Sequence, residues 1–94
     1  MSDSSAAVRQ LIEKLLLHRN MRNAACHVYK PVGLGRMYTV ILEASGIREQ
    51  FFMDGAQVEK FVQTGNAQFV LDEIRTAVRN LDRLVTKKKT ARGR

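Results

Sequence analysis

Basic side chains at a spacing of four residues are the feature of this sequence with the clearest chemistry. Arg75, Arg79, Arg83 and Lys87 recur at this spacing near the C-terminal end of the chain. On an α-helix each step of four drifts by about 40°, so these side chains form one slanting ridge, called the basic ridge below. Its cations would pair with phosphate oxygens and release counterions. The spacing therefore indicates contact with a polyanion, and the alternative is a solvated helix face.

The basic ridge leads into a C-terminal segment of the same charge. The chain has 16 Lys and Arg against 9 Asp and Glu, a net charge of +7, and five of the basic residues lie among the last eight. Residues 1–86 thus have a net charge of only +2. We predict one compact domain over residues 1–86 and a mobile basic tail over residues 87–94, whose cations are Lys87, Lys88, Lys89, Arg92 and Arg94. A tail of this kind holds a polyanion without reading its sequence, or serves only solubility.

A second basic region lies in the first third of the chain. Between residues 9 and 36 there are six basic residues and one acidic residue, whereas residues 37–74 have two basic and six acidic residues. This distribution predicts basic ends and an acidic centre, which would steer a polyanion to one side. The predicted second patch consists of Arg19, Arg22, Lys30 and Arg36.

The apolar pattern indicates the elements that must position these cations. A helix begins after a cap at Ser4 or Ser5 and closes at residues 18–20, and its apolar residues recur at helical spacing. Three strands are predicted at 24–30, 37–43 and 47–53, with connections short enough for an antiparallel meander. Asp54 caps a short helix that ends at Gly65, and a long helix runs from about 67 to about 88. The fold class is α+β, a three-stranded antiparallel sheet with one helix before it and two, one short and one long, after it.

This order of elements is similar to that of double-stranded-RNA-binding domains and of the two small Alu-binding proteins of the signal recognition particle. The double-stranded-RNA module opens its last helix with a lysine cluster, whereas this chain has Thr64-Gly65-Asn66-Ala67-Gln68 at that place. The similarity is therefore one of element order.

The long helix also carries an apolar seam with a 4-3-4-3 spacing: Val70, Ile74, Ala77, Leu81 and Leu84. Such a seam either covers the domain's own sheet or packs against a second copy. We predict a homodimer, formed through the long helix or through sheet edges.

Two aromatic residues in the strands have two interpretations. We predict that Tyr29 and Phe52 are core residues beneath the helices. The alternative is that they share a sheet face with basic groups and stack on unpaired bases.

Other chemistry has little support in the sequence. Cys26 is the one cysteine, it lies in an apolar strand, and only His18 and His27 are available to join it in a metal site. The Gly33-Leu34-Gly35-Arg36 stretch lacks the spacing of a nucleotide-binding loop. We predict no catalytic residue, metal ligand or cofactor, and hence a protein that is not an enzyme.

These observations favour a nucleic-acid-binding protein with low sequence specificity. Single-stranded or structured RNA is favoured over duplex DNA, because no element resembles a recognition helix with a preceding turn. The alternative function is a small homodimeric protein–protein interaction or adaptor module. The N-terminus has no secretory signal pattern and no apolar run could span a bilayer, so we expect no membrane association and a cytoplasmic location, with the nucleus or nucleoid as alternatives.

Overall fold

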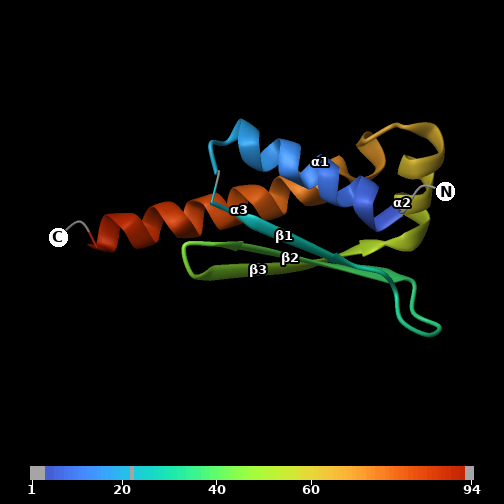
Figure 1. Ribbon diagram of the computed structural model, residues 1–94, viewed down its shortest axis with the longest axis horizontal. Helices are drawn as coiled ribbons and strands as arrows, with labels where there is room; N and C mark the ends of the chain where they lie inside the picture. Colours follow the sequence, from blue (N-terminus) through green and yellow to red (C-terminus); the bar gives the residue numbers. More distant parts are fainter. Residues whose placement is uncertain (1–3, 22, 93–94) are drawn as a thin grey trace.

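The protein is built from one layer of sheet and one layer of helices, as Figure 1 shows. This computed structural model describes residues 4–21 and 23–92, with side chains described as far as Lys88. The elements follow one another as α1 (Ser4–His18), β1 (Ala25–Tyr29), β2 (Met37–Ala44), β3 (Ile47–Asp54), α2 (Gly55–Thr64) and α3 (Gln68–Arg92). The predicted α+β fold, with three antiparallel strands between one helix and two, is confirmed.

The sheet has the strand order β1-β2-β3, with both pairs antiparallel. Along β2 the residues alternate between the helical layer and the opposite face, and the buried set is Tyr38, Val40, Leu42 and Ala44. The β2–β3 hairpin turns at Ser45 and Gly46, whose φ angles are 52° and 79°. Two successive positive φ values are typical of the tight turn that matches the twist of a hairpin. The turn fixes the register in which Ala44 pairs with Ile47.

The helices cover one face of the sheet (Figure 1). Helix α1 packs against β1, α3 packs against β3, and α2 packs against α3. Each helix contributes an apolar stripe to a single core, which includes Val8, Ile12 and Leu16 from α1, Val58 from α2, and Val70, Ile74, Val78 and Leu81 from α3. Within residues 4–21 and 23–92, no helix lies over the opposite face of the sheet.

The apolar seam of α3 is used within the protein. Four of its five residues are at most 4% exposed, namely Val70, Ile74, Ala77 and Leu81. The buried stripe then continues at Val85, whereas Leu84 is 41% exposed. A straight helix with 3.6 residues per turn drifts away from a seven-residue repeat, which explains the change from Leu84 to Val85. A homodimer, which stays a prediction, would therefore need a surface other than these four residues.

Short polar caps fix where the helices begin and end. The Asp54 side chain accepts a hydrogen bond of 3.0 Å from the Ala56 N–H, and Gly65 ends α2 with a φ of 73°. The Asn66 side chain accepts from the Gln68 N–H at 3.0 Å and so caps α3. Helix α3 runs to Arg92, beyond the predicted end near residue 88, so residues 87–92 of the predicted tail are helical.

Candidate nucleic-acid interface

The basic ridge lies on the exposed side of α3. The side chains of Arg75, Arg79, Arg83 and Lys87 are all exposed, because the opposite side of the helix holds the buried stripe. The Arg83 guanidinium donates to the Asn80 side-chain oxygen at 3.1 Å. This neutral partner orients the guanidinium along the helix and leaves its charge uncompensated.

The end of α1 brings Arg19 to the same surface. Its Nη1 lies 2.9 Å from Oδ2 of Asp82 on α3, although the two residues are 63 positions apart. A shallow hollow on the surface is lined by both residues of this ion pair together with Arg79, Arg83, Thr86 and Lys87. We call the cations Arg19, Arg79, Arg83 and Lys87 the basic end. The two basic regions of the sequence thus meet in part, through Arg19.

One carboxylate moderates the charge of this surface. Asp82 is the only acidic residue from position 75 to the end of the chain, and its pairing with Arg19 offsets one cation. Both side chains of the pair remain partly exposed, so solvent screens the interaction. Three cations, Arg79, Arg83 and Lys87, remain to give the basic end its positive field.

The other predicted contacts are not brought to the basic end. Lys30 and Arg36 flank the β1–β2 loop, at the opposite end of the sheet from the C-terminal part of α3 (Figure 1). Lys88 donates from Nζ to the Ser45 carbonyl oxygen at 2.6 Å, so it fastens the hairpin turn to α3. Arg22, Arg94 and the side chains of Lys89 and Arg92 lie outside the described part of the chain.

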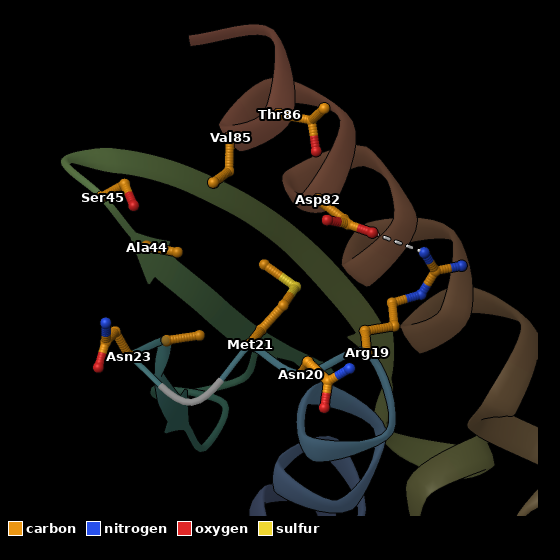
Figure 2. Close-up of a pocket in the computed structure, with 10 residues that line it drawn as sticks. Arg19, Asn20, Met21, Asn23, Ala44, Ser45, Asp82, Val85 and Thr86 are labelled. Atoms are coloured by element: carbon orange, nitrogen blue, oxygen red, sulfur yellow. Dashed lines mark hydrogen bonds and ion pairs between the residues drawn. The ribbon is translucent and has the colours of Figure 1, made fainter. Parts of the chain in front are cut away.

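A pocket adjoins the basic end, and sequence reasoning missed it. Figure 2 shows its lining, which comes from residues 19–21, 23 and 24 after α1, from residues 44 and 45 at the β2–β3 turn, and from α3 between Asp82 and Thr86. The polar residues of this lining are Arg19, Asn20, Asn23, Ser45, Asp82 and Thr86. No periodic pattern marks these positions in the sequence, because they lie in connections or on the flank of a helix.

The opposite end of the sheet presents apolar side chains. The strand register aligns Tyr29, Thr39 and Phe52 in one row on the face without helices. Tyr29 and Phe52 are 52% and 53% exposed, so the prediction that they are core residues is wrong. The alternation of each strand places them on the uncovered face, and sequence alternation does not reveal which face the helices cover. We call the exposed apolar residues of the β1–β2 loop and of the strand ends beside it the apolar patch, namely Tyr29, Val32, Leu34, Met37 and Phe52.

The chemistry of the remaining reactive groups is ordinary. Burial raises the pKa of the Cys26 thiol to about 11, so the sulfur carries its proton at neutral pH and is a poor nucleophile. Residues 4–21 and 23–92 contain no group of three or more His, Cys, Asp or Glu side chains that could hold a metal ion. Over the same residues, no helix is both long and apolar enough to cross a bilayer.

No protein-family model, curated protein sequence or solved structure matches the chain. The interface is therefore interpreted from its own residues.

Proposed function

We propose that this protein binds nucleic acid through its phosphates, with little sequence preference. The observation that carries the proposal is the meeting of Arg19 from α1 with Arg79, Arg83 and Lys87 from α3 on one surface. Because these cations come from two helices, they form a patch rather than a single line. The sugar–phosphate backbone of a nucleic acid that crosses α3 could therefore contact Arg19 of α1 as well as the cations of α3. The predicted tail contains four further basic residues after Lys87.

The arrangement favours backbone contacts over base reading along the helix. The basic side chains of α3 that face solvent are long and flexible, and they neutralise phosphates whatever the base sequence. The first part of helix α3 packs lengthwise against the sheet, and its C-terminal turns extend beyond the β2–β3 turn without a preceding helix and turn of the kind that a recognition helix has. We therefore propose single-stranded or structured RNA before duplex DNA, a cytoplasmic, nuclear or nucleoid location, and a role without catalysis.

The proposal is tested by fluorescence anisotropy with labelled single-stranded and duplex RNA and DNA at about 50 and about 200 mM salt. Binding should weaken steeply with salt, because each phosphate contact releases a counterion. The variant Arg75/Arg79/Arg83→Glu and the deletion of residues 87–94 should each weaken binding and flatten the salt slope. No binding to any of the four nucleic acids at the lower salt would overturn the proposal.

The apolar patch favours a second candidate function, a homodimeric protein–protein interaction module. Val32 and Leu34 are 88% and 102% exposed, and large exposed apolar patches mark interaction sites. Sedimentation of the wild-type protein over a range of concentrations tests this candidate without any nucleic acid. If the protein stayed monomeric at every concentration, self-association through the apolar patch would be excluded.

A further inference from the structure

The pocket beside the basic end has a volume of about 410 Å³, within the range of about 300–1,000 Å³ typical of small-molecule sites. Three parts of the fold form its walls: the connection from α1 to β1, the β2–β3 turn, and α3 from Asp82 to Thr86. The pocket therefore exists only where these three parts meet in the folded protein.

Local backbone structure holds two of these walls in place. Helix α1 ends at His18, and Asn20 follows it at a φ of 59°; the Asn20 N–H donates to the Leu17 carbonyl and the Met21 N–H donates to the Leu16 carbonyl. This pattern is the common glycine-type helix end, for which asparagine is the usual substitute. On the other side, the tight turn at Ser45 and Gly46 fixes the second wall.

Two contacts across the pocket join these walls to α3. The Arg19–Asp82 ion pair ties the end of α1 to the helix, and the bond from Lys88 Nζ to the Ser45 carbonyl ties the hairpin turn to it. A pocket held from both sides needs little reorganisation when a ligand binds, which favours affinity.

The lining combines an apolar floor with polar groups at the margin. In Figure 2 the side chains of Met21, Ala44 and Val85 are turned toward one another across the pocket. Asn20 and Asn23 stand at the margin, where Figure 2 shows their amide groups turned outward from these apolar side chains, and each amide has both donors and an acceptor. A flat ring with donors and acceptors on its edge matches this lining, because its faces are apolar and its edge is polar.

The position of the pocket indicates where such a ring would come from. The pocket shares Arg19, Asp82 and Thr86 with the shallow hollow of the basic end. A nucleotide whose phosphate contacts Arg79 or Lys87 would thus have its base next to the pocket mouth. Asparagine amides are also a common partner for base edges.

We propose that this pocket holds one unpaired base of the nucleic acid whose phosphates lie on the basic end. The inference rests on the proposed function and adds the ligand of a second site. It implies that the protein distinguishes an unpaired segment from a fully paired one. It also implies that a free nucleotide binds far more weakly, because the neighbouring phosphates supply most of the attraction.

The test compares short single-stranded RNAs of each of the four bases with an oligomer of the same length in which every base is absent. The backbone charge is matched, so any difference in affinity reports the bases. We expect the best of the four RNAs to bind about tenfold more tightly than the abasic oligomer, the size of one well-placed base contact. A nucleoside monophosphate, added as a competitor, should not displace the RNA at comparable concentrations.

The variant Asn23→Trp fills the pocket from an exposed position that lies outside the hollow of the basic end, without a change in charge. It should lower RNA affinity to the abasic level and leave abasic binding unchanged. Thr76→Trp, at an exposed position of α3 that lines neither the pocket nor the hollow, is the matched control and should keep the preference. Asn23→Ala serves as a second pocket variant, and circular dichroism checks that each variant is folded.

The outcomes separate this inference from the proposed function. Equal, salt-sensitive binding of RNA and abasic oligomer by the wild type would overturn the pocket assignment and leave phosphate binding intact. Efficient displacement by the nucleoside monophosphate would overturn it in favour of a free-nucleotide site. Absence of binding to every oligomer would overturn both the inference and the proposed function.

Discussion

The two ends of the molecule present different surfaces, separated along a long axis of 49 Å. The basic end, on the C-terminal part of α3 and the end of α1, exposes cations around one carboxylate. The other end, where the β1–β2 loop projects from the sheet (Figure 1), exposes the apolar patch. Charge attracts a polyanion over a distance and yields to salt, whereas apolar contact needs close fit and hardly responds to salt. The two ends therefore differ in the forces by which each could hold a partner.

Helix α3 changes charge along its length in the same sense. Asp72 and Glu73 lie in its second turn, whereas Arg79, Arg83 and Lys87 follow from its middle onward. Partial desolvation of the carboxyl group raises the pKa of Glu73. The negative charge of Asp54 raises this pKa further, by a smaller amount. The first turn of α3 has no acidic residue, so Asp72 and Glu73 lie beyond the part of the helix where the dipole acts most strongly.

The largest expected effect is on the free energy of unfolding, and it comes from a charged substitution in the hydrophobic core that supports both ends. Leu81 is fully buried and lies on α3 between them, so Leu81→Asp places an ionised carboxylate among apolar side chains. We expect a loss of about 4 kcal/mol or more in the free energy of unfolding, measured by urea denaturation with circular dichroism.

Leu84→Asp is the matched control, because Leu84 is exposed on the same helix. It should change the free energy of unfolding by about 0.5 kcal/mol or less. If Leu81→Asp stayed folded and instead separated a dimer into monomers, the seam would be shared between copies, against the burial seen here.

A smaller effect is expected from reversing charge at one end and then at the other. Arg79/Arg83→Glu should weaken nucleic-acid binding by about 100-fold at low salt, because two phosphate contacts become repulsive. Lys30/Arg36→Glu gives the same change in net charge at the loop end, and it should weaken binding by about threefold or less.

Anisotropy titrations of both variants at the same salt make this comparison. Equal losses would mean that affinity follows net charge alone and that the basic end has no special part.

The apolar patch should respond in the opposite way. Val32/Leu34→Ser removes the two most exposed apolar side chains of the β1–β2 loop without touching the core. We expect self-association to weaken about tenfold in sedimentation experiments, and nucleic-acid affinity to stay unchanged. Leu17→Ser, at an exposed apolar residue of α1, is the control and should leave self-association intact. An equal response to both changes would mean that the patch is not an interface.

The fold followed from the sequence because local signals agreed with one another. Alternation in β2, the Ala44-Ser45-Gly46 turn and the caps at Asp54 and Gly65 each depend on near neighbours, and the structure shows all of them. The basic ridge could also be predicted from the sequence, because residues four apart lie on the same side of an α-helix.

What the sequence did not reveal depends on contacts between distant segments. Arg19 meets Asp82 only because α1 and α3 lie on the same side of the sheet. Tyr29 and Phe52 are exposed because the helices pack on the other face of the sheet. The alternation of residues along a strand does not indicate which face the helices cover. The pocket residues Asn20 and Asn23 belong to a connection whose shape is set by the helix end and by the start of β1.

The smallest and most selective change is to the one carboxylate of the basic end. Asp82→Asn keeps the shape of the side chain and removes its charge, so Arg19 gains a free positive charge. We expect nucleic-acid binding to tighten about threefold at low salt, an effect that salt should abolish. The loss of a partly exposed ion pair should cost about 1 kcal/mol or less of stability.

Glu13→Gln is the matched control, because Glu13 also pairs with an arginine, Arg9, at 3.0 Å on an exposed surface. Both substitutions raise the net charge by one and free one guanidinium, but only Asp82→Asn does so at the basic end. Tighter binding in Asp82→Asn alone would show that the phosphates lie within a Debye length, about 10 Å at 0.1 M salt, of position 82. Equal tightening in both variants would instead mean that the nucleic acid also reaches the exposed side of α1, and the interface would then extend along that helix.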